Sequence, residues 1–217
     1  NFATKLKTQP GDWYHWIALF SDNTGVRMVY PDGTPIPSQT MHEAWYTLDQ
    51  QGMIQDGFYL VKNMDGTILQ QVLYRKNVAY NLTFPKDITP VEMASDEFGA
   101  QPYFDFNFVK NMRWSIDNEQ FSQIESVESM VDGAPALQFS IIRDYQTPVD
   151  IAGFPAPVDI SIVRAIFDTD SGESYRIETA YQLIGGDELT SSITVKQLEK
   201  LVTLPDDIQK LIEQPIQ

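Results

Sequence analysis

Two histidines, His15 and His42, are the side chains best suited to acid–base or metal chemistry. His15 lies among the aromatic residues of the segment Trp13–Trp16, and His42 directly precedes Glu43. The sequence contains neither a Gly-x-Ser-x-Gly nucleophile elbow nor a His-Glu-x-x-His helix, the patterns that place histidine in hydrolytic or zinc chemistry. We therefore expect two hydrogen-bonded strand histidines, and the sequence predicts no catalytic residue, metal ligand or cofactor.

A second candidate is the acidic cluster around Gly172, formed by Asp168, Asp170 and Glu178. Oxygen ligands at alternate positions suit Ca²⁺, but the spacing does not fit the EF-hand loop, because Thr179 stands where the bidentate acid belongs. A solvated hairpin turn is the favoured interpretation. Glycoside hydrolysis needs two carboxylates close in space, and nothing distinguishes one pair among the 30 acidic residues.

Aromatic and apolar side chains form the third candidate, an apolar binding surface. The alternative role for such residues is ordinary core packing, because aromatic side chains dominate core burial. The predicted ligand-lining residues are Trp13, Trp16, Trp45, Phe58, Leu60, Tyr74, Phe104, Phe106 and Trp114.

Most of these residues lie on segments with the pattern of antiparallel strands. Between Glu43 and Phe84, aromatic and β-branched runs alternate with turn residues, and Asp65-Gly66 is the clearest hairpin turn. Neither face of these strands is cleanly polar, so both faces need a cover. Further strands are predicted at 13–20, 103–109, 121–130, 136–143, 159–167, 174–183 and 190–201, and a short helix near Val91–Phe98.

The remaining segments complete the predicted architecture. Residues 144–158 hold three prolines and a glycine and are expected to form a surface loop or lid. Pro205, followed by Asp206 and Asp207, predicts the start of a C-terminal helix. The expected fold is a single β-rich domain spanning residues 1–217, of the α+β class but β-dominated.

Composition limits the functional classes. The net charge of -15 disfavours nucleic acid and anionic membrane surfaces as partners. The chain has no cysteine, which excludes disulfides and thiolate chemistry, and no apolar run approaches the ~20 residues of a membrane span. It starts at Asn1, so we expect an upstream signal or lipid-anchored segment to have been removed.

Two hairpins carry a family resemblance. The segment Ala44–Asp49 with its following Asp-Gly-Thr hairpin, and the segment Ala165–Tyr175, resemble bacterial extracytoplasmic proteins of the superfamily of LolA-like lipoprotein carriers and RseB (MucB)-like sigma-factor regulators. The Leu204–Asp206 ending is similar as well. The resemblance implies a strongly curved antiparallel sheet, an unclosed half-barrel, with helices and lipid on its concave side. The sequence departs from the family in residues 1–20, where no long amphipathic helix is recognisable.

The sequence thus leads to a non-catalytic extracytoplasmic protein that binds a lipid or other apolar molecule, or a membrane-anchored partner, on a concave sheet. The alternative is a carbohydrate- or calcium-binding β-sandwich, either an adhesive module or a glycoside hydrolase-like domain. A single sheet would favour the first hypothesis, and two packed flat sheets would favour the second.

Overall fold

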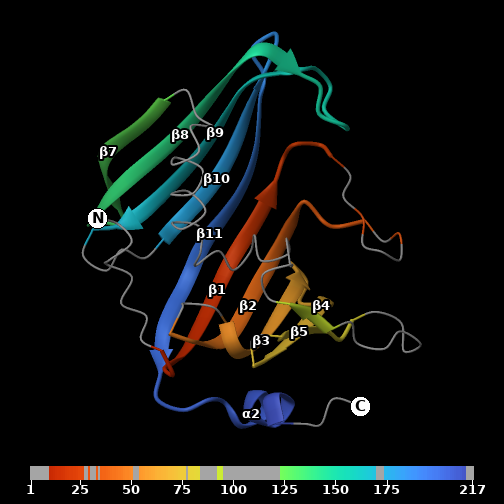
Figure 1. Ribbon diagram of the computed structural model, residues 1–217, viewed down its shortest axis with the longest axis vertical. Helices are drawn as coiled ribbons and strands as arrows, with labels where there is room; N and C mark the ends of the chain where they lie inside the picture. The colour runs from red at the N-terminus through yellow and green to blue at the C-terminus, as the bar shows by residue number, and fades with distance from the viewer. Residues whose placement is uncertain are drawn as a thin grey trace. The chain divides into compact units, whose positions relative to one another are not determined.

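The computed structural model describes residues 10–26, 29, 33, 35–50, 54–76, 78–83, 92–94, 123–169 and 174–213. Within these ranges the backbone forms eleven strands and one helix (Figure 1). The strands are β1 (Trp13–Asp22), β2 (Gln39–Leu48), β3 (Ile54–Asn63), β4 (Ile68–Arg75), β5 (Val78–Asn81), β6 (Glu92–Ala94), β7 (Gln123–Val131), β8 (Ala134–Val149), β9 (Val158–Asp168), β10 (Ser174–Leu183) and β11 (Glu188–Leu201). The helix, α2, spans Asp206–Glu213.

The strands belong to one open sheet with the order β6-β5-β4-β3-β2-β1-β11-β10-β9-β8-β7. Neighbours from β2 to β6 and from β7 to β11 pair in the antiparallel sense. The sheet does not close into a barrel, because β6 and β7 end the order. This confirms the predicted β-dominated fold with an antiparallel sheet and a C-terminal helix.

The chain divides into two compact units. Unit 1 comprises residues 1–7, 20–39 and 109–195 and holds β7 to β10 with most of β11. Unit 2 comprises residues 8–19, 40–108 and 196–217 and holds most of β1 and β2, β3 to β6, and α2.

The hairpin turns follow the predicted residues. Asp65-Gly66 joins β3 to β4, where the Asp65 carboxylate accepts a hydrogen bond from the Thr67 amide at 2.9 Å. Asp132 and Gly133 join β7 to β8 with φ angles of 50° and 83°. Two successive positive φ values are typical of the type I′ turn, whose twist matches that of the flanking strands.

Gly57 in β3 allows two strands to approach closely. It lies opposite Tyr46 of β2, and a Cβ atom at this position would be 2.6 Å from the carbonyl oxygen of Trp45. A larger residue would push β2 and β3 apart, so this glycine is a packing requirement.

Some sequence predictions need correction. Residues 92–94, expected within a short helix, form strand β6 paired with β5. The predicted loop at 144–158 is shorter, since β8 continues to Val149 and only residues 150–157 connect it to β9. The predicted strand at 103–109 lies outside the described residues.

Candidate functional site

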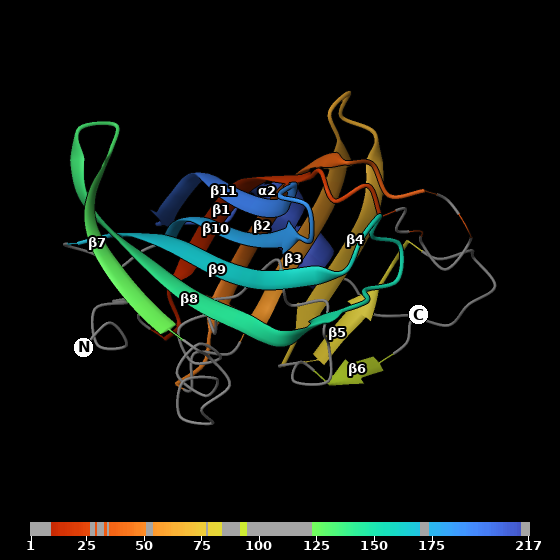
Figure 2. The same cartoon turned by 90° about the horizontal axis from the view of Figure 1, so that it is seen from above.

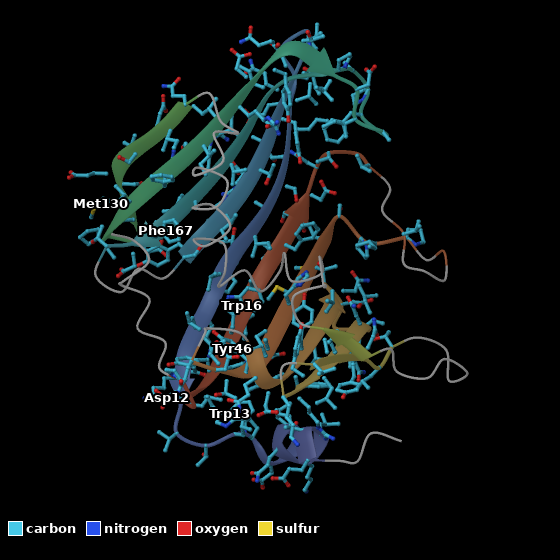
Figure 3. All side chains as sticks on the ribbon, in the orientation of Figure 1. Asp12, Trp13, Trp16, Tyr46, Met130 and Phe167 are labelled. Atoms are coloured by element: carbon cyan, nitrogen blue, oxygen red, sulfur yellow. The ribbon has the colours of Figure 1, made fainter. Side chains whose placement is uncertain are left out.

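Helix α2 covers an apolar cluster on one face of unit 2. Trp45, Phe58 and Leu73 lie directly opposite one another on β2, β3 and β4, which places their side chains on the same face. These three residues and Leu60 pack with Ile208 of α2 in one buried cluster. Figures 1 and 3 show α2 beside this part of the sheet.

The other predicted lining residues lie elsewhere. Trp16 and Tyr74 are 5% and 2% exposed. Trp16 follows His15, which stacks on Trp45, and Tyr74 follows Leu73 of the cluster. Because successive side chains of a strand point to opposite faces, Trp16 and Tyr74 lie on the face opposite α2. Trp13 is half-buried on β1 (Figure 3). Phe104, Phe106 and Trp114 fall outside the described residues. The predicted set is therefore divided between two faces, and its ligand-lining role stays a prediction.

His42 is held in a buried network on the face opposite α2. Its Nε2 lies 2.7 Å from the Thr40 hydroxyl and its Nδ1 lies 2.5 Å from the Tyr59 hydroxyl. Each hydroxyl is able to donate or accept, so a neutral imidazole satisfies both contacts. Burial lowers the pKa of His42 to about 4, which keeps the ring uncharged at neutral pH.

His15 is held in a charged cluster on the same face as Trp45. Its Nε2 lies 2.9 Å from a Glu43 oxygen, its Nδ1 lies 3.1 Å from a Glu199 oxygen, and its ring stacks on Trp45 at 4.9 Å. Lys62 donates to the other Glu43 oxygen at 2.5 Å. Burial opposes ionisation of Glu43, but hydrogen bonds from Lys62 and His15 outweigh it and lower the pKa of this carboxyl.

The two histidines are thus strand histidines with hydrogen-bond partners, as the sequence predicts.

Carboxylates only accept hydrogen bonds, so His15 donates to both acids only when its ring carries two protons. In the described part of the chain, no three His, Asp or Glu side chains are placed to hold a metal ion.

The acidic hairpin candidates also have protein partners. Glu178 accepts hydrogen bonds from Arg164 at 2.8 Å and from Arg176 at 2.5 Å, one on each carboxylate oxygen. Asp168 accepts a hydrogen bond from the Tyr175 hydroxyl at 2.8 Å. Asp170 is not among the described residues. The Glu178 carboxylate is therefore part of an arginine ion-pair ladder.

Sequence reasoning missed an apolar face in unit 1. The strand registers place a set of apolar side chains from four neighbouring strands on one side of the sheet. This set, which we call the unit 1 apolar face, consists of Leu137, Phe139, Ile141, Val163, Phe167, Ile177 and Ile193. Ile141 and Phe167 are buried, whereas the other five are half-buried.

The opposite side of the same strands is charged, with Arg164, Arg176 and Glu178. In β9, however, Ile160, Ile162 and Ile166 stand on this charged side, so β9 shows no simple alternation of apolar and polar residues. The apolar face emerges only when the register across the strands is known. The local signal in β10 was Ile177, which stands between the charged residues Arg176 and Glu178.

No protein-family model and no curated protein matches the chain. Among solved structures, it is similar to MucB in complex with MucA(peri), with 14% identity and a TM-score of 0.48 over 95% of this chain. The chain spans 57% of the length of that MucB chain. It is also similar to the lipoprotein LppX of Mycobacterium tuberculosis, with 8% identity, a TM-score of 0.43 and coverage of 90% and 91% of the two chains.

A LolA superfamily protein from Nitrosomonas europaea, NE2245, matches with 9% identity and a TM-score of 0.33 over 93% of this chain and 91% of that chain. MucB and LolA are the families that the two hairpin motifs resemble. The chain is thus similar to solved structures of both groups that the hairpin motifs resemble. No described helix is long and apolar enough to span a membrane.

Proposed function

We propose that this chain is a non-catalytic binding protein that holds a lipid-like or other apolar ligand against its sheet. The supporting observation is the unit 1 apolar face, whose side chains Leu137, Phe139, Val163, Ile177 and Ile193 are only half-buried. In unit 2 the apolar cluster around Trp45 is covered by α2, which contacts β3 and β4. An apolar surface that no described helix covers is suited to an apolar molecule.

The energetics favour an acyl chain as ligand. Each buried CH₂ group contributes about 0.8 kcal/mol, so one long chain reaches useful affinity without a charged anchor. The single open sheet also favours this proposal over the carbohydrate- or calcium-binding sandwich, which needs two packed sheets. The extracytoplasmic location is part of the proposal and rests on the sequence resemblance.

The experiment compares two adjacent residues of β9 that lie on opposite faces. Val163 belongs to the unit 1 apolar face, and Ile162 lies on the charged side; both are half-buried. The chain and the variants Val163→Gln and Ile162→Gln are incubated with lysophosphatidylcholine, a single-chain lipid without net charge, and examined by native mass spectrometry. Circular dichroism checks that each variant is folded.

The expected result is a 1:1 lipid complex for the unmodified chain and for Ile162→Gln, and at least tenfold less complex for Val163→Gln. If only the ligand-free mass of the unmodified chain is observed at all lipid concentrations, the proposal is refuted, and a protein partner becomes the next candidate for this face. Equal loss in both variants would show that the lipid does not lie on this face.

A further inference from the structure

Strand β7 is a long edge strand of the described sheet that lacks Lys, Pro and a bulge, and its only charged side chains are Glu125 and Glu128. It ends the strand order and pairs with β8 over nine residues without a register shift (Figure 2). Edge strands are commonly protected by Lys, Pro, bulges or short length. The β7 sequence, Gln-Ile-Glu-Ser-Val-Glu-Ser-Met-Val, contains no Lys and no Pro, whereas the other edge strand, β6, has three residues.

The apolar side chains of β7 are exposed. Ile124, Val127 and Met130 have relative exposures of 43%, 56% and 63%. Together with the backbone groups on the outer side of β7, which no described strand pairs, they form a surface suited to β-strand addition.

The sequence of β7 is complementary to itself when inverted about Val127. We propose that β7 pairs with β7 of a second copy of this chain, in an antiparallel register centred on Val127. In this register Val127 meets Val127, Ile124 meets Met130, Glu125 meets Ser129, and Ser126 meets Glu128 of the other copy. Every exposed apolar side chain gains an apolar partner, and every glutamate faces a serine.

The backbone geometry is compatible with this register. Opposed residues are both odd-numbered or both even-numbered, so their N–H and C=O groups point outward in the same way, as an antiparallel ladder requires. Opposed side chains also share a face of the sheet. A shift of the partner by one residue would break both conditions.

The charges of β7 and of the whole chain distinguish a second copy of this chain from other partners of the β7 edge. The proposed register avoids directly opposed carboxylates; the two Glu128 side chains meet only diagonally, at roughly 7–8 Å. Each copy carries a net charge of -15, so repulsion opposes association at low ionic strength. The dimer is therefore expected to strengthen with added salt. One strand pair buries less than the standard interface of about 1,600 Å², so the dimer should be weak and concentration-dependent.

Sedimentation velocity over a concentration series tests the proposal. The unmodified chain should shift from monomer to dimer, and more strongly at higher salt. Val127→Lys places two lysines opposite each other and should weaken association at least tenfold. The matched control is Val202→Lys in unit 2, a fully exposed valine outside the strands, which should associate like the unmodified chain. Thermal melts confirm that both variants are folded.

The absence of cysteine permits a second test that reports the register. Val127→Cys should form a disulfide-linked dimer under mild oxidation at least tenfold faster than Val202→Cys. A monomer at every concentration and salt would overturn the proposal. So would a dimer that Val127→Lys leaves intact, because its interface would then lie elsewhere. Equal cross-linking of the two cysteine variants would also contradict it.

Discussion

The two histidines show how different the hydrogen-bond partners of one residue type are within one sheet. His42 lies between two hydroxyl groups that accommodate a neutral ring, whereas His15 lies between two carboxylates that accept but never donate. Both expectations were correct, because the sequence lacks the Gly-x-Ser-x-Gly and His-Glu-x-x-His patterns that place histidine in hydrolytic or zinc chemistry. It did not reveal the partners, because Tyr59 and Glu199 are distant in the chain and reach the histidines only through strand pairing.

His42 predicts a loss of stability in mild acid. Its pKa in the folded protein is about 4, below the ordinary 6.5, so between these values the unfolded chain binds a proton that the folded chain does not. The free energy of unfolding should therefore fall as pH decreases, by about 1.4 kcal/mol per pH unit, or roughly 2 kcal/mol between pH 6.5 and pH 5. Urea unfolding at several pH values measures this slope.

The control for this prediction is His42→Gln. The variant is less stable at pH 7.5, because it disturbs the contacts with Thr40 and Tyr59. Its stability should nevertheless vary less between pH 6.5 and pH 5 than that of the unmodified chain. Carboxylates such as Glu43, whose pKa is lowered, lose their contribution only at lower pH. Parallel pH profiles for the two proteins would contradict the assignment to His42.

At the scale of the elements, α2 depends on its packing. A helix of eight residues is too short to be stable alone, and its buried residue is Ile208. Ile208→Ala should lower the free energy of unfolding by about 2–4 kcal/mol, because it removes a side chain from the cluster with Trp45 and Phe58. Urea unfolding followed by tryptophan fluorescence measures the change.

Gln209 is the matched control, since its side chain is exposed and donates a hydrogen bond to Glu213 of the same helix. Gln209→Ala should change stability by less than about 0.5 kcal/mol. Equal effects of the two variants would show that the helix is not anchored through Ile208.

Local sequence signals predicted most elements but not all of their limits. Asp-Gly pairs marked the hairpins at Asp65 and Asp132, since these residues adopt the required φ angles at low cost. Pro205 with two following acids marked α2. The error at 144–149 arose because Pro148 suggested a loop, whereas β8 continues there with a register irregularity between Asp144 and Val149. Strand β6 is three residues long, too short for a periodic signal.

At the scale of the whole molecule, the strand order was beyond local reasoning. The neighbours β1 and β11 are separated by most of the chain, and no turn residue connects them. The same limit hid the candidate site, because Leu137, Val163 and Ile177 become one face only through the registers of β8, β9 and β10. The predicted aromatic set was found by residue type, and Trp45, Phe58 and Leu60 of that set lie in the cluster under α2.

The net charge of -15 predicts a salt-dependent stability. Lowering NaCl from 150 to 10 mM extends the screening length from about 8 to about 30 Å, so repulsion among the acidic groups increases. The melting temperature should fall by a few degrees. KCl at equal ionic strength should reproduce the effect of NaCl. A larger stabilisation by CaCl₂ at that ionic strength would instead support the calcium-binding alternative, and a melting temperature independent of salt would contradict the prediction.

The position of α2 in the chain has a consequence for protein synthesis. The cluster of Trp45, Phe58 and Leu73 is translated early, but the Ile208 that covers it leaves the ribosome more than 130 residues later. Strands β7 to β10, in contrast, pair with their immediate neighbours in the chain and are able to form hairpins as they emerge. During translation the cluster of Trp45, Phe58 and Leu73 therefore lacks Ile208 while β7 to β10 assemble. Until α2 has been synthesised, the nascent chain lacks the Ile208 contact to this cluster, and exposed apolar surface of this kind favours aggregation.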